Sequence, residues 1–167
     1  MALYSDHHVE LSHILAEIQD GTLSIPDLQR PFVWDKTKVR DLLDSMMKGY
    51  PVGYIMTWEP LENREKSRQV GVHEHSYNRP SKLILDGQQR LTGLYAAMCG
   101  VPIIDKKFKE DRIIISFNPL DPKFEVANSA ISKNADWIYD IRSNPSSSCR
   151  RSTYRSNRFN GNHRRHV

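Results

Sequence analysis

Five consecutive residues at positions 86–90, Asp-Gly-Gln-Gln-Arg, combine a carboxylate, two amides and a guanidinium. The surrounding stretch, KLILDGQQRLTGLY (82–95), places them where a buried strand meets a helix. A carboxylate can hold a magnesium ion or orient water, and an arginine beside free backbone N–H groups can bind a phosphate. These residue types in this order therefore make the stretch a candidate phosphate site.

A structural interpretation explains most of the same residues. Asp86 and Gln89 have the spacing of a capping box, in which two side chains satisfy free amides at a helix start. Gly87 would permit the tight turn from strand to helix. Arg90 fits this interpretation poorly, because a cation in the first turn opposes the positive end of the helix dipole, and Gln88 has no part in the box. Both interpretations are open on this stretch alone.

A second Gln-Arg pair, Gln29 and Arg30, lies between Pro26 and Pro31. Pro31 disfavours helical backbone at Arg30, so the pair is expected in an extended loop. Two solvated polar residues are one explanation. The apolar residues on either side favour an arginine that lines a cleft, and such an arginine needs an acidic or phosphate partner.

Apolar periodicity predicts three helices that would position these segments. The first lies within residues 5–21 and ends at Gly21, the second covers 36–48 with Asp35 as its N-cap, and the third follows the 86–90 stretch and ends at Gly100. Their apolar stripes consist of Leu11, Ile14, Leu15 and Ile18; of Val39, Leu42, Leu43, Met46 and Met47; and of Leu91, Leu94, Tyr95 and Met98.

Short apolar runs between turn residues predict the strands. The run at 82–86 is continuous, which is typical of a strand covered on both faces, and Trp58 is expected as a core anchor while Trp34 is more open. The element order predicts an α/β fold, more narrowly α+β, in which helices pack against a small mixed sheet. The strand candidates are 22–26, 52–58, 82–86, 112–119 and 123–128, with a hairpin arm around 70–72, and 137–141 is a final apolar segment.

Charge divides the 167-residue chain near Ile141. Residues 142–167 hold seven arginines and no acidic residue. The other 17 basic and 20 acidic residues give residues 1–141 a net charge of −3, although the whole chain carries +4. A slightly acidic fold is not an obvious electrostatic binder of DNA. We expect residues 1–141 to form the domain and the basic Ser/Arg/Asn-rich tail, 142–167, to be disordered or non-native.

Several other function classes are disfavoured. No apolar run is long enough for a membrane span, no secretory signal is visible, and the two cysteines, Cys99 and Cys149, fit a reducing cytoplasm without forming a metal site. His73 and His75 could face one side of a strand, but two ligands do not specify a metal site. The chain has no P-loop signature, so any nucleotide site is of another kind.

Three segments together resemble a known family. GTLSIPDLQRPFVW (21–34), VRDLLDSMMKGYPVGYIMTW (39–58) and LILDGQQRLTGLYAA (83–97) look like the N-terminal domain of GmrSD-type restriction endonucleases, which is related to the ParB/sulfiredoxin-like fold. The resemblance runs from about Val9 to Met98. Its two motifs, the IPxxQR…W segment and DGQQR, are both intact and in the family's order.

The resemblance implies a nucleotide-binding, NTP-hydrolysing module of a modification-dependent DNA restriction system used in phage defence. Such a module is cytoplasmic, uses Mg²⁺ with a nucleoside triphosphate, and works with an HNH-like nuclease domain or subunit, so modified DNA is met only indirectly. No nuclease activity is expected from this chain alone. The alternatives are a non-hydrolysing regulatory or DNA-sensing module that controls a partner nuclease or toxin, and a fragment without independent activity.

Carried over to this sequence, the resemblance places Gln29 and Arg30 on one side of a nucleotide pocket and residues 86–90 on the other. Arg30 and Arg90 would neutralise phosphate oxygens, and Asp86 would hold Mg²⁺ or orient water. Gln88 or Gln89 would position water or read the base, and Gly87 would let the backbone approach a phosphate. The expected catalytic residues are Asp86, Gln88 and Arg90.

Overall fold

The computed structural model describes residues 4–26, 32–59, 67–68, 80–104 and 109–143. Within these ranges the chain forms three α-helices, α1 (Leu11–Asp20), α2 (Lys36–Met47) and α3 (Gln88–Cys99). Two single-turn 3₁₀ helices, η1 (Ile131–Lys133) and η2 (Ile141–Ser143), follow near the end. None of the described helices is long and apolar enough to cross a membrane.

The main sheet has the strand order β2-β4-β1-β3. β1 (Leu23–Pro26) is parallel to β4 (Lys82–Asp86), whereas β2 (Met56–Trp58) pairs antiparallel with β4, and β3 (Ser67–Arg68) pairs antiparallel with β1. The predicted mixed sheet of an α+β fold is therefore confirmed. Two antiparallel hairpins complete the fold, β5 (Ile103–Ile104) with β6 (Glu110–Asp111) and β7 (Ile115–Asn118) with β8 (Lys123–Val126).

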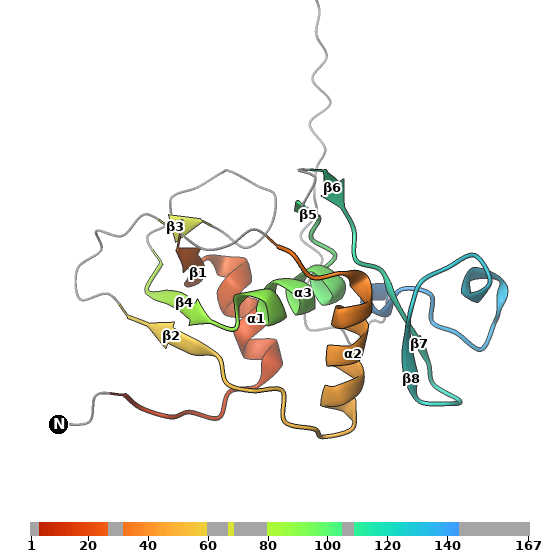
Figure 1. Cartoon of the computed structure of the whole chain (residues 1–167), viewed down its shortest axis with the longest axis horizontal. Coiled ribbons are helices and arrows are strands. Elements are labelled where there is room, and N and C mark those ends of the chain that lie inside the picture. The colour runs from red at the N-terminus through yellow and green to blue at the C-terminus, as the bar shows by residue number, and fades with distance from the viewer. Residues whose placement is uncertain (1–3, 27–31, 60–66, 69–79, 105–108, 144–167) are drawn as a thin grey trace, which may run out of the picture.

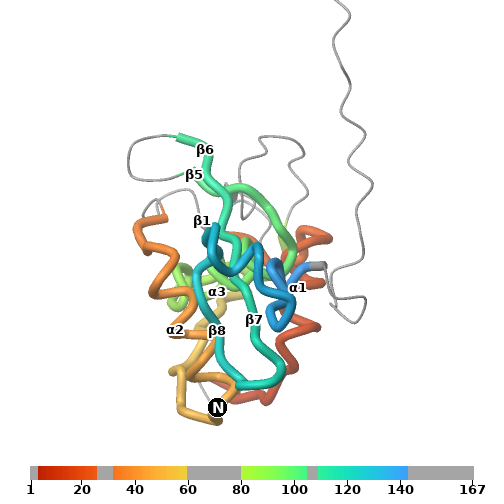
Figure 2. Tube along the Cα trace, turned by 90° about the vertical axis from the view of Figure 1, so that its right-hand side faces the viewer, coloured from red at the N-terminus to blue at the C-terminus, as the bar shows by residue number. Residues whose placement is uncertain are grey.

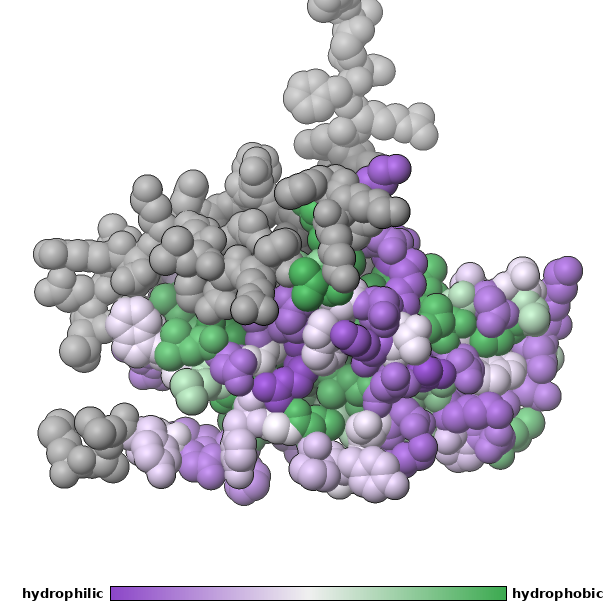
Figure 3. Space-filling model, in the orientation of Figure 1, coloured by the Kyte–Doolittle hydropathy of each residue, from purple (hydrophilic) through white to green (hydrophobic). Residues whose placement is uncertain are grey.

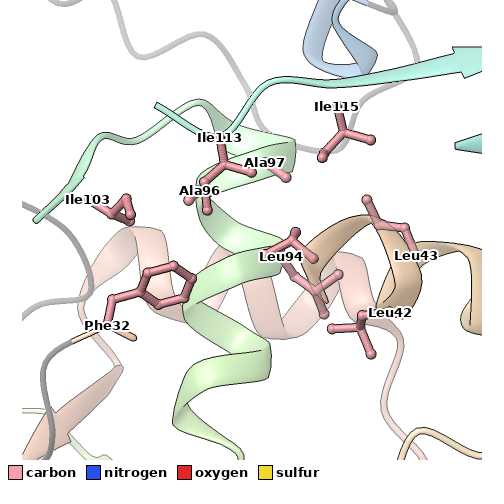
Figure 4. Close-up of a cluster of buried hydrophobic side chains, with 10 residues drawn as sticks. Phe32, Leu42, Leu43, Leu94, Ala96, Ala97, Ile103, Ile113 and Ile115 are labelled. Carbon is pink, nitrogen blue, oxygen red and sulfur yellow. The ribbon is translucent and has the colours of Figure 1, made fainter. Parts of the chain in front are cut away.

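Helix α3 lies between α1 and α2 in both views of the fold (Figures 1 and 2). It is buried on both sides, because it contributes to two separate apolar clusters. The first cluster packs α3 against α2 and the β7 side (Figure 4), and the second packs it against α1, β1 and β4. The first consists of Phe32, Val39, Leu42, Leu43, Leu94, Ala96, Ala97, Ile103, Ile113 and Ile115, and the second of Leu15, Ile18, Leu23, Ile25, Ile84, Leu91 and Tyr95.

Local signals fix several helix ends as expected. Asp35 caps α2, since its side chain accepts a hydrogen bond of 2.8 Å from the backbone N–H of Lys38. Gly21 ends α1 in the left-handed conformation, at a φ of 83°, and Gly100 ends α3 at a φ of 71°. α1 starts only at Leu11, so the first part of the range 5–21, in which this helix is predicted, is not helical.

Three expectations about the sheet are wrong. The segment 52–58 is a strand only from Met56 to Trp58. β4 is not covered on both faces along its length, because Leu83 and Ile84 are buried but Leu85 is 44% exposed. Trp58 is 42% exposed and is no core anchor, whereas Trp34 packs against the first apolar cluster. Figure 3 shows the resulting apolar surface over the β2–β4 part of the sheet.

Candidate functional site

The carboxyl ends of β1 and β4 lie at the same edge of the sheet because these two strands are parallel neighbours. Such edges are where open α/β sheets bind ligands, since the loops that follow the strands converge there. The IPxxQR motif follows β1 and the DGQQR motif follows β4. Gln29 and Arg30 lie outside the described residues, so their predicted place in the pocket is untested; the description resumes at Phe32.

Helix α3 begins without the predicted capping box. Its N-cap is Gly87, at a φ of 87°, and no side chain of the described residues caps it. Asp86 is instead the last residue of β4, with its side chain 76% exposed. The capping-box interpretation is therefore wrong, because the chain turns from strand to helix through the left-handed conformation of a glycine, which leaves the Asp86 carboxylate facing solvent.

Gln89 joins the two motifs. Its Oε1 atom accepts a hydrogen bond of 2.9 Å from the backbone N–H of Val33, a residue 56 positions earlier in the chain. Val33 belongs to the end of the first motif, between the buried Phe32 and Trp34. Gln88, its neighbour in α3, is only 9% exposed. The structure therefore brings the end of the IPxxQR…W segment against the first turn of α3.

Arg90 is held by backbone carbonyls. Its Nη1 donates to the oxygen of Val52, and its Nη2 donates to the oxygen of Tyr54 at 2.7 Å. Nη2 also lies 3.7 Å from the Asp86 carboxylate, and the Arg90 side chain is 19% exposed. These acceptors offset the unfavourable position of a cation in the first helical turn, so Arg90 anchors the segment before β2 to the start of α3.

Two glycines permit this close approach. A Cβ atom on Gly53 would lie 2.6 Å from Nη1 of Arg90, and one on Gly87 would overlap Cδ1 of Ile55. Both residues also have positive φ values, 82° and 87°. A side chain at either glycine would displace the tip of Arg90 or Ile55 and strain the backbone, so both glycines favour the close approach of the segment before β2 to the turn into α3.

The sequence interpretation missed the contribution of the 52–55 segment to this site. The acceptors are main-chain oxygens of Val52 and Tyr54, and a backbone carbonyl gives no residue-type signal. Gly53 between them is the one available hint. The HEH segment with His73 and His75 lies outside the described residues, and no group of three metal-binding side chains occurs among the described ones.

The assembled edge has the parts of an anion site with a nearby carboxylate. The amides of the first turn of α3 lie beside the exposed carboxylate of Asp86 and the guanidinium of Arg90. Amides at a helix start attract phosphate, and Mg²⁺ commonly takes only one or two protein carboxylates when phosphates supply its other ligands. One exposed carboxylate at this position is compatible with such a shared ion.

Comparison with known proteins gives a family match and a curated relative. Residues 11–165 match the family model described as the GmrSD restriction endonuclease, N-terminal domain. A curated relative, uncharacterized protein MJ0686 of Methanocaldococcus jannaschii, is 30% identical over 104 residues, which cover 54% of this chain and 18% of that protein. The chain therefore spans less than a fifth of that relative's length.

No solved structure matches the chain significantly, and the likeness to the ParB/sulfiredoxin-like fold stays a prediction. The family match, in contrast, spans both motifs and nearly all of the sequence. This chain belongs to the family of GmrSD restriction endonuclease N-terminal domains.

Proposed function

We propose that this chain is the NTP-binding and NTP-hydrolysing module of a modification-dependent DNA restriction system. Family membership supports the broader part, a component of a restriction system. The observation that carries the nucleotide site is the hydrogen bond between Gln89 and Val33, which draws the two family motifs together at the carboxyl ends of β1 and β4. A triphosphate bound there would meet residues of both motifs.

Each residue of the second motif has a distinct task in this proposal. The backbone amides at the start of α3 bind phosphate oxygens, and Gly87 lets the backbone approach them. Asp86 orients the attacking water or holds the metal ion, and its exposure leaves it available. Gln88 and Arg90 complete the reacting site, with Gln29, Arg30 and Gln89 as further nucleotide-binding residues.

Asp86 is the residue that would hold Mg²⁺, jointly with phosphate oxygens. Bound there, the ion would supply charge neutralisation on the phosphates during transfer. One exposed carboxylate fits this use, because Mg²⁺ that is shared with phosphates needs only one or two protein ligands. A site made of protein ligands alone would need at least three close together, and the described residues contain no such group.

The nuclease function belongs to a partner in this proposal. The chain spans only 18% of the length of its curated relative, so most of that protein lies outside the matched region. We place the cleavage of modified DNA in an HNH-like nuclease domain or subunit, controlled in the cytoplasm by the nucleotide state of this module.

Phosphate release from the four NTPs with Mg²⁺ tests the proposal. Asp86→Asn should lower the rate of release roughly 100-fold, a typical loss for a group that orients or activates water. Its stability should stay within about 0.5 kcal/mol, because the Asp86 side chain is 76% exposed. Asp136→Asn, at an exposed position after β8, is the matched control and should retain the full rate. Equal rates in both variants would contradict the assignment of Asp86.

The contacts of Arg90 favour a second candidate, a non-hydrolysing regulatory module. Both of its terminal nitrogens already bind carbonyl oxygens, which suits an anchor better than a cation that follows growing phosphate charge. This candidate predicts a nucleotide-dependent rise in melting temperature without phosphate release. Arg90→Ala should lower the melting temperature of the nucleotide-free protein. Its effect on activity must therefore be compared with this loss of stability.

A further inference from the structure

Residues 50–55, which we call the strap, connect the end of α2 to β2 and lie against the turn into α3. They form neither helix nor strand, and four of the six are exposed. The other two, Val52 and Ile55, are partly buried and pack against the first and the second apolar cluster. Two side chains therefore hold the strap to the body of the protein, together with the bonds that its backbone makes.

Arg90 fastens the backbone of the strap to α3. Its Nη1 and Nη2 atoms donate to the carbonyl oxygens of Val52 and Tyr54. In this position the guanidinium lies 3.7 Å from the Asp86 carboxylate and is 19% exposed. Gly53, between the two acceptors, lets the strap lie against the tip of Arg90. One cation of the DGQQR motif thus connects the candidate nucleotide site to the segment that leads into β2, an edge strand of the described sheet.

A bound phosphate would compete with the strap for this cation. In the bonds to the oxygens of Val52 and Tyr54 only the donor is charged, whereas a bond to phosphate joins a cation to an anion and is stronger. The planar fork of a guanidinium also matches two phosphate oxygens at once. A ligand shifts such an equilibrium only through a difference in affinity, so an NTP must bind more tightly when Arg90 has left the carbonyl oxygens.

We propose that Arg90 acts as a latch, which holds the strap in the nucleotide-free protein and exchanges the two carbonyl oxygens for phosphate oxygens when an NTP binds. This inference rests on the proposed function, because the same nucleotide site supplies the phosphate. The exchange accounts for both roles of Arg90, an anchor without nucleotide and a phosphate ligand with it. The released strap carries Tyr50 and Tyr54, which are 62% and 82% exposed, so a partner that contacts them would sense the nucleotide state.

Limited digestion with chymotrypsin measures the latch in the wild-type protein. The protease cleaves after aromatic residues, and Pro51 protects the bond after Tyr50, so the bond between Tyr54 and Ile55 is the cleavable bond of the strap. A non-hydrolysable NTP analogue with Mg²⁺ should speed its cleavage roughly tenfold, the effect of losing hydrogen bonds of ordinary strength. Inorganic triphosphate should act in the same way, because the latch responds to phosphate. Cleavage after Tyr139, which is 42% exposed, is the internal control and should not change.

Arg90→Lys tests the same latch without nucleotide. An ammonium group lacks the planar fork of donors that reaches two separate oxygens. The strap of the nucleotide-free variant should therefore be cleaved about as fast as that of the nucleotide-bound wild type. Arg40→Lys is the matched control, because Arg40 pairs with Glu125 on β8. This control should keep both the slow cleavage without nucleotide and the response to the analogue.

The outcomes separate the latch from the proposed function. If calorimetry shows that a nucleotide binds while cleavage after Tyr54 stays unchanged or becomes slower, the latch is wrong and the proposed function stands. Equal acceleration after Tyr54 and Tyr139 would also overturn the latch, because it would report a general loosening of the fold. Slow cleavage in nucleotide-free Arg90→Lys would do the same. Wild-type protein that binds none of the four NTPs would refute the proposed function and the latch together.

Discussion

The turn from β4 into α3 depends on Gly87, which has a φ of 87° and no side chain to meet Ile55. Gly87→Ala should destabilise the protein by about 2–4 kcal/mol, since it adds left-handed strain to a steric overlap. Gly49→Ala is the matched control, because Gly49 also has a positive φ, of 73°, but open space around its missing Cβ. The control should lose only about 1–2 kcal/mol in urea denaturation. Equal losses would show that the overlap with Ile55 relaxes freely.

Residue types alone predict the DGQQR motif as a site, but they do not predict its contacts. Asp86 and Gln89 have capping-box spacing, yet Gly87 takes the cap position and Gln89 binds the backbone of Val33. The correct partners are main-chain groups distant in sequence, and neither composition nor spacing encodes them. The anomaly of a cation at a helix start did identify Arg90 as unusual, and its carbonyl acceptors explain that position.

Helix α2 owes its start to Asp35, whose side chain accepts from the Lys38 amide at 2.8 Å. Asp35→Ala should therefore cost about 1 kcal/mol of stability, because one amide of the first turn loses its partner. Asp35→Asn keeps a capping oxygen and should lose little. Chemical denaturation of the two variants measures the difference. A loss in Asp35→Asn as large as in Asp35→Ala would point to the charge rather than to the cap.

Elements with strong local signals are predictable here, and those that depend on distant partners are not. α2 and β4 follow from a cap, an apolar stripe and a short apolar run. The segment before β2 looks like a strand by its apolar residues, but Gly53 and the Arg90 anchor keep residues 52–55 out of the sheet. Trp58 is then left on an edge strand, exposed where an aromatic residue suggested a core.

Burial of Tyr95 makes the folded molecule sensitive to alkaline pH. Desolvation raises the pKa of its hydroxyl above the ordinary value of 10.0. Because the pKa of Tyr95 is higher in the folded state than in the unfolded state, its contribution to stability is fully present below about pH 10. This contribution is lost as the pH rises through the folded-state pKa. Tyr95→Phe should reduce the fall in unfolding free energy above about pH 10. Tyr50→Phe, at a side chain that is 62% exposed, should not.

Lys82 adds to the same dependence. A hydrogen bond to Glu17 raises the pKa of its ammonium group, so this contact also weakens as the pH rises through the folded pKa. Glu17→Gln should reduce the alkaline loss of stability further when combined with Tyr95→Phe. Stability curves at several pH values between neutral and strongly alkaline measure both effects, and parallel curves for all variants would contradict them.

At the scale of the whole molecule we also expect no cleavage of modified DNA by this chain alone. This expectation follows from our proposal that an HNH-like nuclease domain or subunit carries out the cleavage. Incubation with modified plasmid and Mg²⁺, followed by electrophoresis, measures this directly. Cleavage that disappears in Asp86→Ala would contradict the division of labour between this module and a nuclease partner.

Because α3 belongs to both apolar clusters, neither cluster can open without exposing the other. Amide protons in the middle of α3, around Leu94 to Ala97, should then exchange with solvent only through global unfolding. A ligand that binds at the start of α3 would slow the exchange of amides in both clusters at once, including those of α1 and α2, which lie on opposite sides of the helix.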